Sequence, residues 1–124
     1  MPDQDPAEVL ELLRRHLREH GFGDIEVVDH NGERPAKTRL DDPLVVTVRR
    51  SVQEVYGSEP NLIPMSAGSG PMHVLCQARN IPAVSIGVGH SDSRTHAPNE
   101  NIYLADFVRG IKLIATVMHR FGIA

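Results

Sequence analysis

A polar loop from Gly87 to Glu100, with the sequence GVGHSDSRTHAPNE, holds most of the side chains in this protein that could do chemistry. It contains two histidines, an aspartate and an Asn-Glu pair, and it lacks the apolar periodicity of a core strand or an amphipathic helix. The apolar run from Ile81 to Val88 leads into it and predicts a strand buried on both faces. Because open α/β folds place their chemistry at the carboxyl ends of buried strands, we expect a functional site in this loop.

His96 has two interpretations when its local sequence is taken alone. An imidazole in a polar loop is commonly a solvated side chain, and no cysteine or histidine lies nearby at the spacing of a zinc site. His90 and Asp92 could form a local pair, but the single residue between them gives no standard ligand geometry. The loop residues by themselves therefore leave open whether His96 is a metal ligand.

Two further stretches also have a functional and a structural interpretation. The turn Gly68-Ser69-Gly70 precedes a predicted helix, and it either holds an anion on its backbone N–H groups or is an ordinary turn. It is not a phosphate-binding loop, because no Gly-Lys-Ser/Thr sequence follows it. Arg34, which stands ahead of Pro35, could be an ordinary surface charge.

The composition narrows the classes of function. The chain has 124 residues and a net charge of −3, with two tyrosines, three phenylalanines and no tryptophan, a balance that does not favour a nucleic-acid partner. The single cysteine excludes a disulfide framework and suits a reducing, cytoplasmic compartment. No apolar run approaches the roughly 20 residues of a membrane span, so we expect no membrane partner.

The hydrophobic pattern predicts helices that alternate with strands. The predicted helices cover residues 6–20, 43–56, 71–79 and 104–121. The predicted strands cover residues 24–29, 62–65 and 81–88. The last helix should have one broad apolar face, made of Phe107, Val108, Ile111, Ile114, Ala115 and Met118.

This order of elements is typical of an α/β fold, although two or three strands are few for a doubly wound sheet. We therefore expect the remaining strands of the sheet to come from elsewhere. Gly32 is predicted to supply a positive φ in the turn after the first strand. Pro35 interrupts the chain after the first helix–strand pair, which places a unit boundary near Arg34.

Three motifs follow one another along the chain: Arg34-Pro35-Ala36, Gly68-Ser69-Gly70-Pro71 and His96-Ala97-Pro98-Asn99-Glu100. With them the chain resembles the C-terminal third of the co-catalytic zinc metallopeptidase and amidohydrolase family. That family includes carboxypeptidase G, aminoacylase, succinyl-diaminopimelate desuccinylase and the carnosinase-type dipeptidases. The resemblance covers nearly the whole chain, and its last motif is the most specific.

The resemblance implies an α/β fold in two parts. Residues 1–33 would be the tail of a lid domain, contributing the last helix and strand of a ferredoxin-like domain that dimerises in this family. Residues 34–124 would be the C-terminal part of the catalytic, aminopeptidase-like α/β domain. The same resemblance therefore implies a homo-oligomer.

On the metal side, the resemblance implies that His96 is the terminal imidazole ligand of one of two zinc ions. Asn99 and Glu100 would support the loop that contains this ligand, as residues around metal ligands commonly do.

On the substrate side, Arg34 would bind a carboxylate through its planar guanidinium group. Gly68, Ser69 and Gly70 would contact the same end of the substrate. His96 and Ser69 are accordingly expected at one edge of the sheet.

The other functional groups of the family do not occur here in matching contexts. Its His-x-Asp pair, its Glu-Glu pair with the general base and a further acidic ligand all lie upstream, so the chain contains no catalytic residue of its own. The resemblance implies the C-terminal segment of a zinc-dependent peptidase or amidohydrolase that cleaves an amide bond next to a free carboxylate.

The implied partners are the N-terminal remainder of the enzyme and a peptide or N-acyl amino acid substrate. Alone, the chain should be inactive and should hold no zinc tightly, because one imidazole leaves most of the metal shell to water. The alternative is a stand-alone, non-catalytic binding or assembly module that retains the fold.

Overall fold

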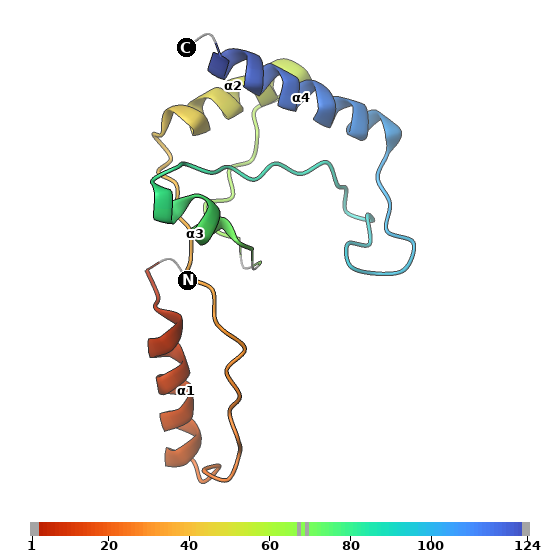
Figure 1. Cartoon of the computed structure of the whole chain (residues 1–124). Coiled ribbons are helices and arrows are strands. Elements are labelled where there is room, and N and C mark those ends of the chain that lie inside the picture. Colours follow the sequence, from red (N-terminus) through yellow and green to blue (C-terminus); the bar gives the residue numbers. More distant parts are fainter. Residues whose placement is uncertain (1–2, 67, 69, 123–124) are drawn as a thin grey trace. The chain divides into compact units, whose positions relative to one another are not determined.

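The computed structural model describes residues 3–66, 68 and 70–122, and the regular structure of these residues is helical (Figure 1). The helices are α1 (Pro6–Glu19), α2 (Pro43–Tyr56), α3 (Met72–Leu75), the 3₁₀-helix η1 (Gln77–Arg79) and α4 (Leu104–Gly122). Among these residues, no helix is long and apolar enough to cross a membrane.

The chain divides into two compact units, and each unit is built from two separate stretches of sequence. One unit comprises residues 1–37 and 64–83, and the other comprises residues 38–63 and 84–124. These units reflect contacts within this chain alone. The assignment of residues 1–33 to a lid domain and of residues 34–124 to a catalytic domain therefore stays a prediction.

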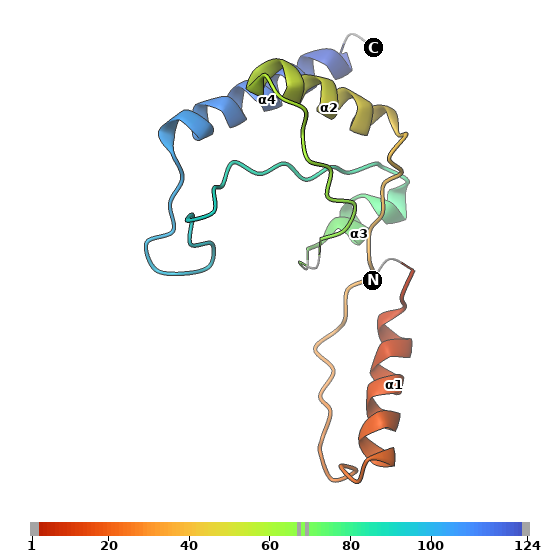
Figure 2. The same cartoon turned by 180° about the vertical axis from the view of Figure 1, so that it is seen from behind.

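In the first unit, the extended segment that follows α1 runs back beside this helix toward its start (Figures 1 and 2). The predicted helix over residues 6–20 is confirmed, with its end one residue earlier than predicted. Asp5 is the N-cap, and its Oδ1 accepts a hydrogen bond from the Ala7 N–H at 2.9 Å, ahead of Pro6 at the first helical position. The helix ends at Glu19, and Gly21 follows in the left-handed conformation with φ 83°.

The returning segment passes close to the start of α1 at Gly32. The predicted positive φ at this glycine is wrong, because Asn31 takes the left-handed conformation instead, with φ 65°. Asparagine tolerates that conformation well. The glycine is required for a different reason: a Cβ at Gly32 would lie 2.6 Å from the Cβ of Pro6, closer than side-chain atoms approach.

In the second unit, α2 and α4 pack against each other (Figures 1 and 2). The buried apolar side chains are Val45 and Val48 from α2 and Leu113 from α4. Ser51 is fully buried beside them, and its hydroxyl donates a hydrogen bond to the Thr47 carbonyl at 2.9 Å. This bond removes the cost of burying an unpaired hydroxyl.

The predicted ends of α2 are confirmed, whereas the predicted helix over residues 71–79 is interrupted. Asp42 caps α2 by accepting a backbone N–H of its first turn at 2.8 Å, and Gly57 closes the helix with φ 72°. Cys76, with φ −122° and ψ −65°, separates α3 from η1. Asn80 ends η1 in the left-handed conformation, as expected of a cap residue.

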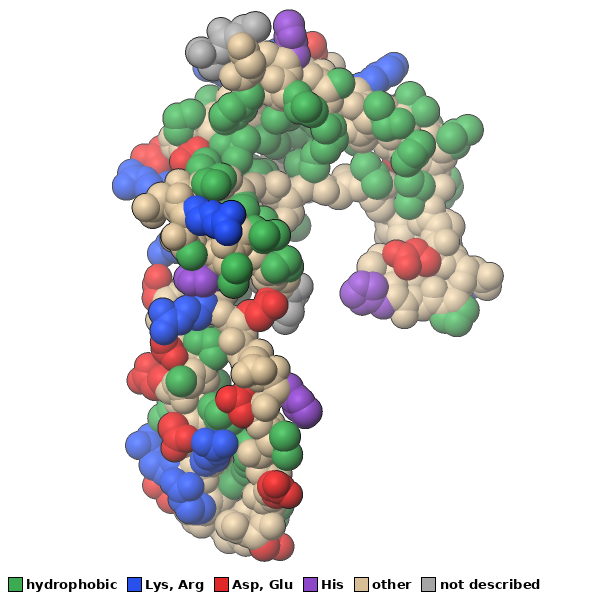
Figure 3. Space-filling view, viewed as in Figure 1, with side chains coloured by type: hydrophobic (Ala, Val, Ile, Leu, Met, Phe, Trp, Pro, Cys, Tyr) green, Lys and Arg blue, Asp and Glu red, His purple; other side chains and the backbone are tan. Residues whose placement is uncertain are grey.

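The apolar face predicted for α4 exists, but in this chain it is exposed. The side of α4 that is buried contains Gly110 and Leu113 instead. Phe107, Ile111 and Met118 have exposed fractions of 50%, 54% and 69%. The other exposed members of the predicted face are Val108, Ile114 and Ala115. Figure 3 shows hydrophobic side chains gathered over this helix. A helix that is apolar on both sides normally lies inside a larger protein.

The strands predicted at residues 24–29, 62–65 and 81–88 do not form in the described part of the chain, so this part of the α/β prediction is wrong for the chain as it stands. A strand exists through ladder hydrogen bonds to a neighbour, and these segments do not pair with one another. The run from Ile81 to Val88 is a trace without helical turns, and its side chains are half-buried or exposed. Without adjacent strands, an apolar sequence does not make a sheet.

Candidate functional site

The loop before α4 is closed at its base by hydrogen bonds around Ser93 and Asn101. Ser93 is buried, its Oγ accepts the His90 N–H at 2.7 Å, and its own N–H donates to the His90 carbonyl at 3.0 Å. The Asn101 N–H donates to the Ser93 carbonyl at 3.0 Å. The side-chain amide of Asn101 donates to the carbonyls of Asp92 at 3.3 Å and Asn99 at 3.0 Å. The two ends of the loop are thereby fixed to each other.

His96 lies in an exposed turn of this loop. Its backbone is left-handed with φ 62°, as are the backbones of Arg94 with φ 53° and Asn99 with φ 63°. The Ala97 N–H closes the turn by donating to the Arg94 carbonyl at 2.9 Å. Within the described residues, neither the His96 ring nor the Glu100 carboxylate has a hydrogen-bond partner, so the imidazole is available as a ligand.

The bonds that support the loop come from residues that the sequence pattern did not single out. Asn101 and Ser93 make them, and Asn101 directly follows the predicted motif. The one sequence signal for the role of Asn101 was an asparagine directly after Asn99-Glu100. That role depends on the loop folding back to Asp92, which the sequence pattern does not show. The supporting roles of Asn99 and Glu100 stay predictions.

Arg34, predicted to bind a substrate carboxylate, is exposed and belongs to the first unit. Its Nη2 donates to Oδ2 of Asp5 at 2.7 Å. Asp5 is also the N-cap of α1, so one carboxylate holds both the guanidinium and the first turn of the helix. The guanidinium therefore already engages a carboxylate in this chain.

The glycine turn also belongs to the first unit. The Gly68 N–H donates to Ser66 Oγ at 3.3 Å, and Gly70 is half-buried. Ser69 lies outside the described residues, so its expected placement at one edge with His96 stays a prediction. The helix after this turn has only four residues, which is too short to provide a strong anion site.

Within residues 3–66, 68 and 70–122, no group of three or more His, Cys, Asp or Glu side chains could hold a metal ion. His96 offers one imidazole, whereas zinc sites in proteins use three or four protein ligands. His90 and Asp92 do not replace them, because both ring nitrogens of His90 have hydrogen-bond partners and the Asp92 carboxylate lies 3.7 Å from Arg94 Nε. The described part of the chain therefore does not form a complete zinc site by itself.

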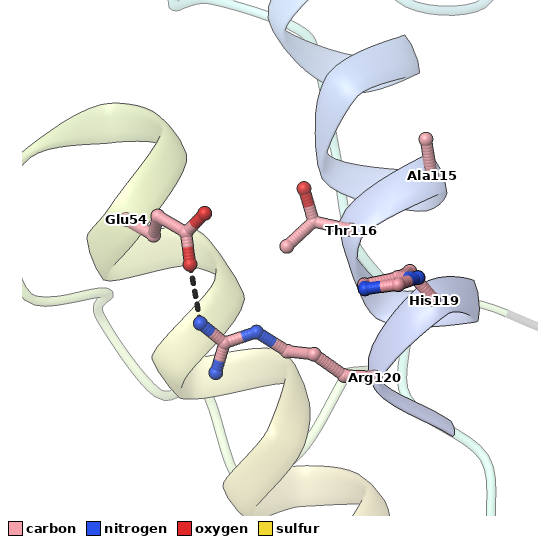
Figure 4. Close-up of a pocket in the computed structure, with 5 residues that line it drawn as sticks. All are labelled: Glu54, Ala115, Thr116, His119 and Arg120. Atoms are coloured by element: carbon pink, nitrogen blue, oxygen red, sulfur yellow. Dashed lines mark hydrogen bonds and ion pairs between the residues drawn. The ribbon is translucent and has the colours of Figure 1, made fainter. Parts of the chain in front are cut away.

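A hollow of about 650 Å³ lies between α2 and α4, and its lining includes none of the predicted site residues (Figure 4). Its lining consists of Glu54, Ala115, Thr116, His119 and Arg120. Arg120 extends from α4 and forms an ion pair with Glu54 on α2. The Thr116 hydroxyl donates to the Lys112 carbonyl within the helix at 2.8 Å. The positive charge of Arg120 is therefore neutralised by Glu54. The hollow does not offer a set of free groups for catalysis.

Comparison with known proteins relates these residues to part of a larger protein. Residues 6–120 match the family described as Peptidase family M20/M25/M40, which is zinc-dependent. The whole chain is similar to the crystal structure of an M20 family metallo-carboxypeptidase, Sso-CP2 from Sulfolobus solfataricus, with 35% sequence identity and a TM-score of 0.79. It spans 29% of the length of that protein. The resemblance inferred from the three motifs is confirmed, and the chain belongs to peptidase family M20/M25/M40, as part of the peptidase fold.

Proposed function

We propose that this chain is the C-terminal segment of a zinc-dependent peptidase or amidohydrolase that cleaves an amide bond next to a free carboxylate. The observation that supports this most is the 35% identity, over the whole chain, to a metallo-carboxypeptidase of the same family. The substrate class would be a peptide or an N-acyl amino acid. The activity would belong to the complete enzyme, and the chain alone would be inactive.

His96 would hold one of two zinc ions through its imidazole. Its exposure and its lack of a protein partner among the described residues support this role. The remaining ligands would come from the N-terminal remainder of the enzyme, since the described residues contain no group of three that could hold a metal. When bound, the metal pair would act as a Lewis acid and lower the pKa of a bound water.

Arg34 would bind the substrate's carboxylate. Its guanidinium stays exposed while it pairs with Asp5 at 2.7 Å, so a substrate carboxylate can replace that partner. A planar fork of donors suits this exchange, because it recognises a carboxylate by geometry as well as by charge. Gly68, Ser69 and Gly70 would contact the same end of the substrate.

The enzyme would act in the cytoplasm, as the single cysteine suggests. The alternative function is a non-catalytic binding or assembly module. The observation that favours this alternative is that no group of three metal-ligating side chains occurs among the described residues.

The test is reconstitution with the N-terminal part that this proposal expects upstream in the same reading frame. The joined protein should bind two zinc ions and release amino acids from N-acyl substrates. His96→Ala should abolish hydrolysis and release one zinc. Arg34→Ala should raise KM roughly 10- to 100-fold, because a hydrogen bond to a charged group contributes about 1.5–3 kcal/mol.

Arg79→Ala is the matched control for Arg34→Ala, since Arg79 is an exposed arginine of the same unit and has no ion pair among the described residues. It should leave KM unchanged. An upstream sequence without the His-x-Asp and Glu-Glu pairs would favour the assembly module instead. Full activity of the His96→Ala protein would refute the proposed metal ligand.

A further inference from the structure

We propose that His90, as a neutral imidazole protonated on Nε2, is the positioning residue that fixes the loop containing His96. The importance of this role for catalysis rests on the function proposed above, but the fixing of the loop is a property of this chain. His90 stands six positions before His96 and does not contact it through any hydrogen bond among the described residues.

The hydrogen bonds of the ring define its tautomer. The Asp92 N–H donates to His90 Nδ1 at 3.2 Å, so this nitrogen carries no proton. Nε2 lies 3.0 Å from Oδ1 of Asn101. An amide oxygen only accepts hydrogen bonds. Nε2 therefore carries the proton and donates a hydrogen bond to Asn101 Oδ1. Both ring nitrogens are satisfied only in this one neutral form.

The orientation of the Asn101 amide supports the same assignment independently. Its Nδ2 lies 3.3 Å from the Asp92 carbonyl and 3.0 Å from the Asn99 carbonyl. Two carbonyl acceptors require the NH₂ group on that side, which leaves Oδ1 facing His90. The imidazole must therefore be the donor of this pair.

His90 also makes an aromatic contact at the far end of the loop. Its ring stacks on Tyr103, with centroids 4.0 Å apart and planes 19° from parallel. Tyr103 immediately precedes α4. The side chain of His90 thus joins the start of the loop to its end and to the first turn of a rigid helix.

This anchoring matters because the loop between these contacts has an unusual backbone. Arg94, His96 and Asn99 are all left-handed, and non-glycine residues keep that conformation only when their surroundings determine it. A metal ligand is useful only if its direction is fixed. Since the His96 ring has no hydrogen-bond partner of its own within the described ranges, its direction depends on the fixed ends of the loop.

The first test uses NMR on this chain. Long-range ¹H–¹⁵N correlation should show His90 as the neutral Nε2-protonated form. His90→Phe retains a ring for the Tyr103 stack and loses both ring hydrogen bonds. In this variant, the amides of residues 91–101 should exchange at least about tenfold faster, while those of α2 and α4 remain protected, as expected for local opening.

His119→Phe is the matched control, because His119 is exposed in the same unit and its ring has no hydrogen bond among the described residues. It should leave the exchange of the loop unchanged. His90→Gln retains a donor that can reach Asn101, and it should restore part of the lost protection. A different tautomer at His90, or unchanged exchange in His90→Phe, would overturn the inference.

The second test uses the joined enzyme described above. His90→Phe should lower kcat and zinc affinity about 10- to 100-fold, as losses behind a metal ligand do, with KM little changed and partial rescue by His90→Gln. Unaltered kcat and zinc affinity would overturn the catalytic role of His90. If the wild-type joined protein holds no zinc, the proposed function fails, and the loop measurement alone decides whether His90 fixes the loop.

Discussion

Arg39 and Asp41 form a bidentate ion pair just before α2. Arg39 Nε lies 2.8 Å from Oδ1 of Asp41, and its Nη2 lies 2.6 Å from Oδ2. The hydrogen bond from Arg39, together with its positive charge, lowers the pKa of the Asp41 carboxyl. The same pairing raises the pKa of Arg39. Both side chains are exposed, so solvent limits what this pair contributes to stability.

The pair predicts a pH effect of defined sign. Because the pKa of Asp41 is lower in the folded chain than its ordinary value of about 3.9, its stabilising contribution is present above that value. It is lost as the pH falls through the folded pKa. Arg39→Ala should return the pKa of Asp41 upward toward the ordinary value, as measured by carboxyl ¹³C NMR titration.

Arg49→Ala is the control, since Arg49 pairs with Glu59 and not with Asp41. It should leave the titration of Asp41 unchanged. An unmoved Asp41 titration in Arg39→Ala would show that the pair does not persist in solution.

At the scale of elements, the sequence predicted what is decided locally. Asp5 and Asp42 cap helices through atoms two residues away, so their roles could be inferred from short motifs. The run from Ile81 to Val88 needs a neighbouring strand, which no local pattern can provide. His96 was predicted as a site residue through its motif, and this stays a prediction. Asn101 was missed, because its bonds depend on how the loop returns to Asp92.

Gly110 allows a close packing contact on the buried side of α4. It is buried in the helix, and a Cβ there would lie closer to Cγ1 of Val88 than side-chain atoms approach. Val88 is β-branched and stiff about χ1, so it cannot turn away cheaply. The absence of a side chain at Gly110 therefore allows the segment before the loop to approach α4.

We expect Gly110→Ala to destabilise the chain despite improving helix propensity. Alanine gains about 1 kcal/mol over glycine inside a helix. Overpacking against Val88 costs about 1–3 kcal/mol, so the net change should be zero to about 2 kcal/mol of lost stability. Urea unfolding measures this difference.

The double variant with Val88→Ala isolates the contact. In that background the clash is removed, so Gly110→Ala should stabilise by about 1 kcal/mol through helix propensity alone. Equal stabilisation by Gly110→Ala in both backgrounds would show that Val88 does not approach α4 in solution.

At the scale of the molecule, the exposed apolar face of α4 is the dominant feature. Phe107, Ile111 and Met118 are each at least half exposed on a helix whose other side is already packed. Such a continuous apolar surface favours association. We propose that the N-terminal remainder of the enzyme covers this face, and that copies of the chain associate through it when the remainder is missing.

Light scattering tests this proposal. The isolated chain should form oligomers at micromolar concentrations, and the double variant Ile111→Glu/Met118→Lys should be monomeric, because two charges disfavour burial of the face. Lys112→Glu is the control on the same helix: it changes an exposed charge without altering the apolar face, and it should leave association intact.

Adding the N-terminal remainder should replace the oligomers by a one-to-one complex, since both partners would compete for one surface. A wild-type chain that stays monomeric at high micromolar concentration would contradict self-association, and oligomers that persist with the remainder bound would place the contact elsewhere.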